Sequence, residues 1–222
     1  GYGQTETAPV ISSNPISKIK LETVGIPFKG VTVKLAEDGE ILVKGENVMN
    51  GYWNDPESTS KVLVNGWIHT GDVGEIDTEG YIKITDRKKD IIVNKGGDNI
   101  SPSRIQEKLE IQPEISQSMI YGDHKNYLVA IVVPSEDFIK EWIEKKDKNL
   151  KLLDLSKDNA FNESVSKIIE IVNEDLSIIE KIRKFIIANE PFSVENEMMT
   201  PTLKVRRFRV IAKYGDELEL LY

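Results

Sequence analysis

Two hairpin signals near the start of the chain limit this region to antiparallel β structure. Apolar and polar residues alternate through 31–43, and Asp38-Gly39 supplies a tight turn between the two halves. A similar arrangement returns through 73–84, where the turn ends in Gly80. A period of two buries one face of a strand, and Gly permits the left-handed backbone that such turns use. This region is therefore predicted to form a small antiparallel sheet or barrel.

Beyond about residue 86 the pattern changes to short strands joined by helices. Ser101 followed by Pro102 is a typical helix start, and apolar residues recur at steps of three or four through 165–179. We expect strands over 91–93, 116–121, 128–133 and 185–188, with helices beginning at Ser101 and Ser135, extending over about 165–179, and beginning at about Phe208.

The charged run Arg87-Lys88-Lys89-Asp90 lies where the two patterns meet. From composition alone it is either a linker between domains or the solvated tip of a hairpin. The linker interpretation gives a β-rich subdomain over 1–85, followed by a compact α+β domain over 86–222 with a helical insertion at about 135–183. The fold class predicted for the whole chain is α+β.

Composition excludes several classes of protein. Hydrophobic residues make up 39% of the 222 residues and charged residues 30%, a balance typical of globular proteins. The formal net charge of -8 disfavours nonspecific binding to nucleic acid or anionic lipid. No apolar run is long enough for a membrane helix, and the lack of Cys excludes disulfides and thiolate chemistry. We expect a cytoplasmic protein and, since motif residues begin directly at Gly1, a piece of a longer one.

The candidate chemistry lies in short polar strings. Residues 1–7, Gly-Tyr-Gly-Gln-Thr-Glu-Thr, combine an aromatic ring that can stack on a base with hydroxyls for phosphate and a carboxylate for Mg²⁺. Asp72 can accept hydrogen bonds from a vicinal diol, and the planar fork of Arg87 can bind ribose or phosphate oxygens. Lys204 is a cation on a flexible stem, suited to a carboxylate that meets a phosphate. Taken alone, the string at 1–7 also fits an ordinary polar loop.

In order and spacing, these strings resemble the later motifs of the adenylate-forming superfamily, which includes acyl-CoA synthetases, firefly luciferase and the adenylation domains of peptide synthetases. The matching strings are GYGQTET, TGD, DRKKDIIVNKGGDNISP and PTLKVRR, and together they span nearly the whole chain. The GYGQTETAPVIS opening, the GGDNISPSRIQEKLE segment and the long insertion between Val133 and Lys204 are similar to the long-chain fatty acid CoA ligases.

The resemblance implies two half-reactions at one site. A carboxylate first attacks the α-phosphate of ATP to give an acyl-adenylate and pyrophosphate, and the thiol of CoA then displaces AMP. By this resemblance Tyr2 would stack on adenine, Thr5 would contact the α-phosphate, Glu6 would ligate Mg²⁺, Asp72 and Arg87 would bind the ribose, and Lys204 would bridge the acyl carboxylate and the phosphate.

The resemblance also implies a hinge at Lys89, about which a small C-terminal domain swings between the two half-reactions. Gly96 and Gly97 would then line the channel for CoA. Asp86 departs from the family pattern, since many members carry Gly before the Arg. His69 and His124 gain no role from the motifs, and we interpret His69 as a packing or loop residue.

The predicted function is that of the C-terminal fragment of an AMP-forming long-chain fatty acid CoA ligase, an acid-thiol ligase of lipid metabolism. The fragment is expected to be inactive alone, because the phosphate loop and the fatty acid tunnel of the family lie upstream. Its expected partners are fatty acid, ATP and CoA, without nucleic acid or a transmembrane segment; peripheral contact with the inner face of the membrane through missing regions stays open. The alternatives are another acyl- or aryl-CoA ligase of the superfamily and a noncatalytic module that binds CoA or a carrier protein.

Overall fold

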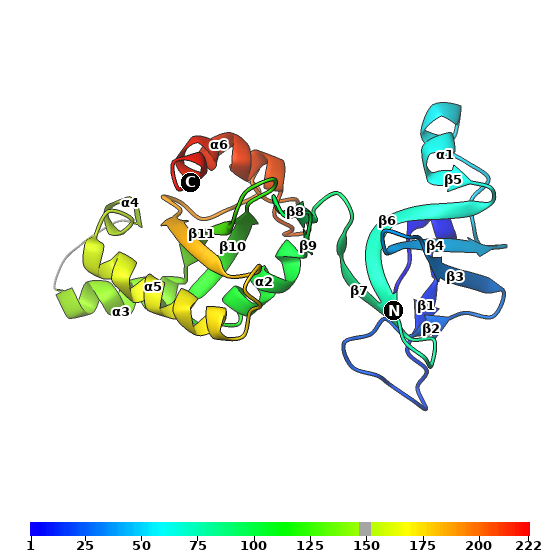
Figure 1. Cartoon of the computed structure of the whole chain (residues 1–222), viewed down its shortest axis with the longest axis horizontal. Coiled ribbons are helices and arrows are strands. Elements are labelled where there is room, and N and C mark those ends of the chain that lie inside the picture. Colours follow the sequence, from blue (N-terminus) through cyan, green and yellow to red (C-terminus); the bar gives the residue numbers. More distant parts are fainter. Residues whose placement is uncertain (147–151) are drawn as a thin grey trace. The chain divides into compact units, whose positions relative to one another are not determined.

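The computed structural model describes residues 1–146 and 152–222, which form two compact units, Gly1–Ile91 and Ile92–Tyr222 (Figure 1). The elements of the first unit are the short 3-10 helix η1 (Thr5–Thr7), the strands β1 (Ser12–Ser13), β2 (Ile26–Pro27), β3 (Val31–Leu35), β4 (Glu40–Gly45), β5 (Leu63–Val64), β6 (Trp67–Ile76) and β7 (Ile82–Arg87), and helix α1 (Pro56–Val62).

The first unit is built on a five-stranded antiparallel sheet. Its strands follow the order β3-β4-β6-β5, and β7 also pairs with β6. The two predicted hairpins are confirmed as β3–β4 and β6–β7. A register shift between Val73 and Gly74 interrupts the β6–β7 ladder, and the long strand β6 curves visibly (Figure 1). The core of the first unit is formed by the fully buried residues Ile11, Ile41, Val43 and Ile82.

The second unit contains the remaining strands and helices. They are β8 (Ile92–Val93), β9 (Asn99–Ile100), α2 (Pro102–Glu110), β10 (Ile115–Tyr121), β11 (Leu128–Pro134), α3 (Glu136–Lys146), α4 (Leu152–Leu155), α5 (Asn159–Glu174), β12 (Ile182–Ile187) and α6 (Arg207–Glu219).

Strand β11 is buried on both faces and separates two apolar cores. One core combines Leu128, Ala130 and Val132 with apolar residues of α2 and α5, and the other combines Val129, Ile131 and Val133 with residues of α6. Successive side chains of a strand point to opposite faces, so this alternation places helices on both sides of the sheet β10-β11-β12. The α+β fold class predicted from the sequence is thereby confirmed.

Strand β12 pairs with β11 in parallel, an arrangement that the sequence analysis did not anticipate. Parallel neighbours need a crossover connection, and the segment that contains α3, α4 and α5 provides it. This segment falls within the predicted insertion at about 135–183, of which 147–151 lie outside the described residues. No helix within the described ranges combines the length and the apolar character needed to cross a membrane.

The apolar pattern predicted over 165–179 extends past the end of its helix. Helix α5 stops at Glu174, and Asp175 already has φ -87° and ψ 0°. Leu176 beyond it is still buried, whereas Ile179 is 43% exposed. The last part of the apolar pattern therefore lies in the connection between α5 and β12.

The first unit extends beyond the boundary expected after residue 85. Strand β7 continues through Arg87, which is the register partner of Asp72. The amide of Lys88 then donates to the carbonyl of Gly71 over 2.8 Å. The structural division comes after Ile91, because these pairings keep the start of the charged run within the first unit.

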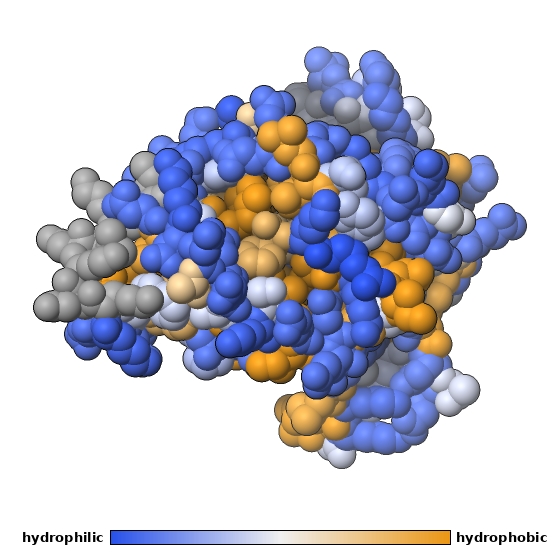
Figure 2. All heavy atoms as spheres, turned by 60° about the vertical axis from the view of Figure 1, so that its left-hand side comes forward, coloured by the Kyte–Doolittle hydropathy of each residue, from blue (hydrophilic) through white to orange (hydrophobic). Residues whose placement is uncertain are grey.

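The surface alternates between hydrophilic and hydrophobic areas. Figure 2 shows hydrophilic residues over most of one face, with hydrophobic residues in patches between them. Individual apolar side chains are almost fully exposed, notably Ile16 at 98% and Trp53 at 97%. Exposed apolar groups of this size are suited to contact with a partner or with further parts of a protein when they gather in patches.

Candidate functional site

The loop at residues 1–7 is fixed by hydrogen bonds. Thr7 is fully buried, and its hydroxyl accepts from the amide of Gln4 (3.1 Å) and donates to the carbonyl of Gln4 (3.0 Å). From outside the loop, the Asn47 side chain donates to the carbonyl of Thr7 (3.0 Å). Thr5 and Glu6, on the turn between these anchors, are therefore presented in a defined position.

Close backbone approach accounts for the glycine between Tyr2 and Gln4. A Cβ atom on Gly3 would lie 1.7 Å from the carbonyl oxygen of Pro9. No side chain can be accommodated at that distance, so Gly is required where the loop folds back on itself.

The carboxylate of Asp72 is the centre of a polar network. Its Oδ2 accepts from the Tyr2 hydroxyl (2.6 Å) and from the Gln4 side-chain amide (3.0 Å), and its Oδ1 pairs with Nε of Arg87 (2.8 Å). Asp72 is only 4% exposed. The structure thus brings together Tyr2, Asp72 and Arg87, three of the residues selected from the sequence. Gln4 completes the network, and the sequence analysis assigned it no role although it lies within the quoted motif.

The β6–β7 ladder sets this geometry. Asp72 and Arg87 are register partners, and the amide of Asp72 donates to the hydroxyl of Thr70 (3.1 Å). A carboxylate has about four lone-pair positions, so beside its three bonds Asp72 retains capacity for one further hydrogen bond, such as one from a hydroxyl of a diol. Burial, followed by the hydrogen bond to Asp72, raises the pKa of Tyr2 well above its ordinary value. The hydroxyl therefore remains a proton donor at neutral pH.

A polar cavity of about 360 Å³ lies beside this network. Its lining consists of Gly3, Gln4, Thr5, Glu6, Tyr52, Val62, Ile68, His69, Thr70 and Arg87. It brings together Thr5, Glu6 and Arg87, three of the residues selected from the sequence. It also contains Tyr52, whose hydroxyl donates to Oε1 of Glu6 (2.8 Å), and His69, interpreted earlier as a packing or loop residue. The hydrogen bond to Glu6, with a smaller effect of burial, raises the pKa of Tyr52.

The cavity suits a metal only together with a ligand. Within the described residues, no group of three or more His, Asp or Glu side chains could hold a metal ion. Mg²⁺ is commonly held by one or two carboxylates together with substrate phosphates and water. Glu6 uses one oxygen for Tyr52 and can offer the other, so the residues present fit a magnesium ion that arrives with a phosphate.

In the second unit, Lys204 ends a tight loop. The amide of Thr200 donates to the carbonyl of Lys204 (2.8 Å), and the amide of Lys204 donates to the hydroxyl of Thr200 (3.0 Å). Leu203 adopts a left-handed φ of 59° and is 70% exposed. The loop therefore fixes the backbone at Lys204 while its side chain extends into solvent.

Gly96 and Gly97 form the turn between β8 and β9. Gly97 has φ 90°, and its amide donates to the carbonyl of Asn94 (3.0 Å). Lys89, the expected hinge, is exposed in the turn that follows β7. Of the residues selected from the sequence, Tyr2, Thr5, Glu6, Asp72, Arg87 and Lys89 belong to the first unit, and Gly96, Gly97 and Lys204 belong to the second.

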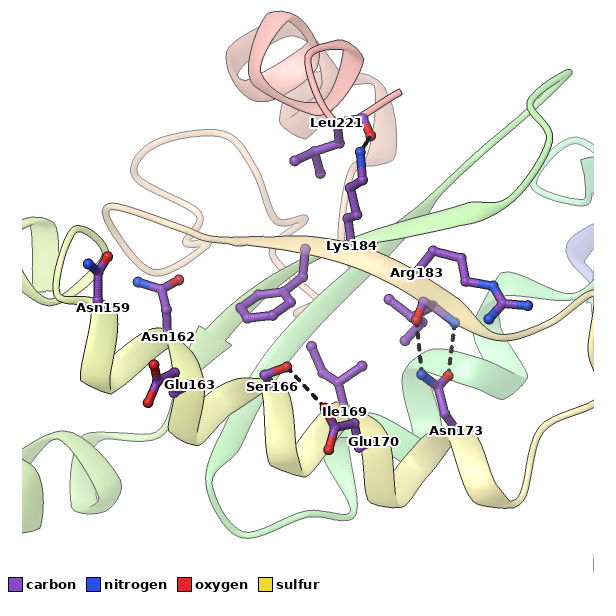
Figure 3. Close-up of a pocket in the computed structure, with 12 residues that line it drawn as sticks. Asn159, Asn162, Glu163, Ser166, Ile169, Glu170, Asn173, Arg183, Lys184 and Leu221 are labelled. Atoms are coloured by element: carbon purple, nitrogen blue, oxygen red, sulfur yellow. Dashed lines mark hydrogen bonds between the residues drawn. The ribbon is translucent and has the colours of Figure 1, made fainter.

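The second unit has a cavity of its own, of about 620 Å³, between α5 and β12 (Figure 3). Asn173 closes one part of it by hydrogen bonding both the amide and the carbonyl of Ile182, each over 2.9 Å. Lys184 reaches the carbonyl of Leu221 at the end of the chain (Figure 3). None of the residues selected from the sequence lines this cavity.

Comparison with known proteins agrees with the motif order. Residues 1–53 match the family described as AMP-binding enzyme, and residues 89–222 match the one described as AMP-binding enzyme C-terminal domain. The chain is 34% identical to the long-chain-fatty-acid–CoA ligase FadD15 of Mycobacterium bovis, an alignment that covers 100% of this chain and 37% of the relative. It is 30% identical to long-chain-fatty-acid–CoA ligase 5 of Mus musculus, covering 100% of this chain and 35% of the relative.

The fold of the chain is also similar to that of solved structures. The A-PCP didomain of the carboxylic acid reductase from Segniliparus rugosus, solved in complex with AMP, is similar with a TM-score of 0.74 and 26% identity. The similarity covers 100% of this chain and 30% of that one. The chain thus spans little more than a third of the length of the curated relatives, 37% and 35%.

Proposed function

This chain belongs to the AMP-binding enzymes, whose C-terminal domain its residues 89–222 match, and from that membership we propose that it is the C-terminal part of an AMP-forming long-chain fatty acid CoA ligase. The observation that carries the proposal is the Asp72 network beside a polar cavity that holds Thr5, Glu6 and Arg87. The similarity of the whole chain to long-chain-fatty-acid–CoA ligases supports the substrate class.

In the first half-reaction, the first unit binds the nucleotide of ATP. Asp72 accepts a hydrogen bond from a ribose hydroxyl, and Arg87, held on Asp72 over 2.8 Å, adds a ribose contact. Tyr2 offers its ring to adenine while its hydroxyl stays fixed on Asp72. Thr5 contacts the α-phosphate, and Glu6 would hold Mg²⁺, which would supply charge neutralisation at the phosphates.

The attack of the fatty acid carboxylate on the α-phosphate brings two anions together. The ammonium group of Lys204 lowers the electrostatic cost of that approach by lying between them. The carboxylate oxygen forms the new bond to phosphorus, and pyrophosphate leaves. The thiol sulfur of CoA then attacks the acyl carbon, the bond to AMP breaks, and the thiol proton is released.

The second half-reaction requires Lys204 to give way to CoA. We place the pivot at Lys89, in the exposed turn that separates β7 from the second unit. The turn at Gly96 and Gly97 lines the path of CoA, since Gly permits a close approach of the backbone. The large-domain part thus comprises the first unit up to the pivot at Lys89, slightly beyond the expected 1–85, and the swinging domain comprises the residues that follow the pivot. The enzyme is one of fatty acid metabolism that draws on cytoplasmic ATP and CoA.

The test uses the full-length enzyme that contains this chain. Incubation with a long-chain fatty acid, ATP, Mg²⁺ and CoA is expected to yield acyl-CoA with equal amounts of AMP and pyrophosphate. A panel of short-chain and aryl acids in parallel reactions distinguishes a long-chain ligase from another ligase of the family. Release of ADP, or no thioester with any acid, would contradict the proposal. The 222-residue chain alone is expected to be inactive.

A further inference from the structure

We infer that Glu40 is a positioning residue of the nucleotide site, which holds the His69 ring at the cavity and fixes the neighbours of both Asp72 and Arg87. The inference rests on the proposed function, because it assumes that a nucleotide occupies the cavity. Nothing in the sequence motifs pointed to Glu40, which lies along the chain between the two parts of the site, residues 2–6 and residues 69–87.

Glu40 is a buried carboxylate with three partners. Its side chain is 5% exposed, and Oε2 accepts from Nζ of Lys88 over 2.9 Å and contacts Nδ1 of His69 over 3.0 Å. The other oxygen, Oε1, accepts from the amide of Gly71 over 2.9 Å. A buried carboxylate with this many donors is firmly oriented, and it orients each donor in return.

Two of these partners are direct neighbours of the ribose-binding pair. Gly71 precedes Asp72, and Lys88 follows Arg87. The amide of Lys88 also donates to the carbonyl of Gly71 over 2.8 Å, so a second layer of bonds lies next to the Asp72–Arg87 ion pair. A small shift of either strand would misalign two groups that must meet one ribose.

The third partner faces the ligand space. His69 lines the cavity and its side chain is 33% exposed. The carboxylate of Glu40 can only accept a hydrogen bond, so the proton of the neutral His69 ring resides on Nδ1. The other nitrogen, Nε2, is then a hydrogen-bond acceptor. Among the described residues, Nε2 of His69 makes no hydrogen bond, so it is available to a hydroxyl of the nucleotide.

The charge of Glu40 is maintained despite its burial. Burial by itself raises the pKa of the carboxyl, but the bonds from Lys88, His69 and Gly71 outweigh it and leave the pKa below the ordinary value. Glu40 is therefore an anion at neutral pH. An amide in its place has only one acceptor oxygen, so its NH₂ group would face either the amide of Gly71 or the Lys88 ammonium and the protonated Nδ1 of His69.

The test measures the binding of AMP, CoA and fatty acid separately to the full-length enzyme by titration calorimetry. Glu40→Gln is expected to raise the Kd for AMP about tenfold while leaving the Kd values for CoA and fatty acid within twofold. His69→Gln is expected to raise the Kd for AMP about threefold. Glu37→Gln is the matched control, because Glu37 is an exposed carboxylate of the same hairpin and should change nothing.

If the role of Glu40 were purely structural, Glu40→Gln would weaken the binding of AMP, CoA and fatty acid together. That result, or unchanged AMP binding, overturns the inference. If Glu40→Gln does not fold, His69→Gln and Lys88→Met decide, since each removes one partner at a partly exposed site. Unchanged AMP affinity in both variants overturns the inference as well. Failure of the proposed function looks different, because then the wild-type enzyme and Glu37→Gln bind no AMP, which overturns both proposals.

Discussion

The two units hold their proposed functional groups in opposite ways. In the first unit, Asp72 is buried and already bonded to Tyr2 and Arg87. In the second unit, the backbone of Lys204 is fixed, yet within the described ranges its ammonium makes no hydrogen bond or ion pair. A group that binds one ligand throughout gains from a prebuilt network, whereas a cation needed in one half-reaction is released more easily when no standing partner holds it.

The strongest test of this contrast is Lys204→Ala. Pyrophosphate release from fatty acid and ATP should fall about a thousandfold, because the substitution removes a charge that acts only as the two anions meet. Thioester formation from supplied acyl-adenylate and CoA should stay near the wild-type rate. Both rates can be followed in the full-length enzyme by coupled pyrophosphate and thiol assays.

Lys167→Ala is the matched control, because Lys167 is an exposed lysine on α5 in the same unit. It should leave both rates unchanged. An equal loss of the two half-reactions in Lys204→Ala would show that the lysine does not act in adenylation alone.

Damage to the prebuilt network should have a different character. Asp72→Asn keeps the shape of the side chain but removes the charge opposite Arg87, so the Kd for ATP should rise about a hundredfold. Both half-reactions should suffer, since both depend on the bound nucleotide. Glu75→Gln on the same strand is exposed and serves as the control in the same calorimetric titration. Loss of adenylation alone would remove the contrast with Lys204.

What the sequence could predict follows from how local each signal is. The β3–β4 hairpin was predictable because its turn chemistry and alternation lie within a few residues. Helix α1 was missed, although Asp55 accepts from the amide of Ser58 (2.9 Å) and Pro56 begins the helix, which is a local signal. The parallel pairing of β12 could not be read from either strand, because a long helical connection separates it from β11.

The site shows the same division. The Asp72 network joins Tyr2 and Arg87, which the motif resemblance had selected, with Gln4, to which it had given no role. The partners of Glu40, in contrast, lie on β6 and in the turn after β7. Gly71 and Lys88 stand within the quoted motifs, but the motifs gave no role to them, to His69 or to Glu40 itself. Contacts of this kind depend on the pairing of β4 with β6, which α1 and β5 separate along the chain and which a register shift at Glu40 interrupts, so no local signal specifies them.

A substitution at the proposed hinge, Lys89, should have a smaller effect, and it should affect only one of the two half-reactions. Lys89→Pro fixes φ in the exposed turn and should slow thioester formation about tenfold, while adenylation changes less than twofold. Lys89→Ala keeps the backbone free and should leave both rates near wild type. Stopped-flow measurement of each half-reaction in the full-length enzyme checks this expectation. Equal rates in the Pro variant and the wild type would move the pivot away from Lys89.

The smallest expected effect is on the pH dependence of stability, and it is tested on one carboxyl group from each unit, Glu40 and Glu110. Hydrogen bonds lower the pKa of Glu40 against the effect of burial, whereas partial burial raises the pKa of Glu110 against the bonds from Ser118. A lowered pKa stabilises the fold above the unfolded value of about 4.5, and this contribution is lost as the pH falls through the folded pKa. A raised pKa acts in the opposite sense, so Glu110 costs stability as the pH rises from about 4.5 through its folded pKa.

Glu110→Gln should therefore raise Tm by a few degrees at pH 7, since Gln can still accept from the amide of Ser118 that now bonds Glu110 over 2.8 Å. At pH 4 the difference from wild type should shrink. Glu40→Gln should lower Tm at pH 7 and lose less stability than wild type on acidification. Calorimetric scans of the enzyme at several pH values measure all three forms. The same sign of change in both variants would mean that the two units do not differ in how they hold buried carboxyl groups.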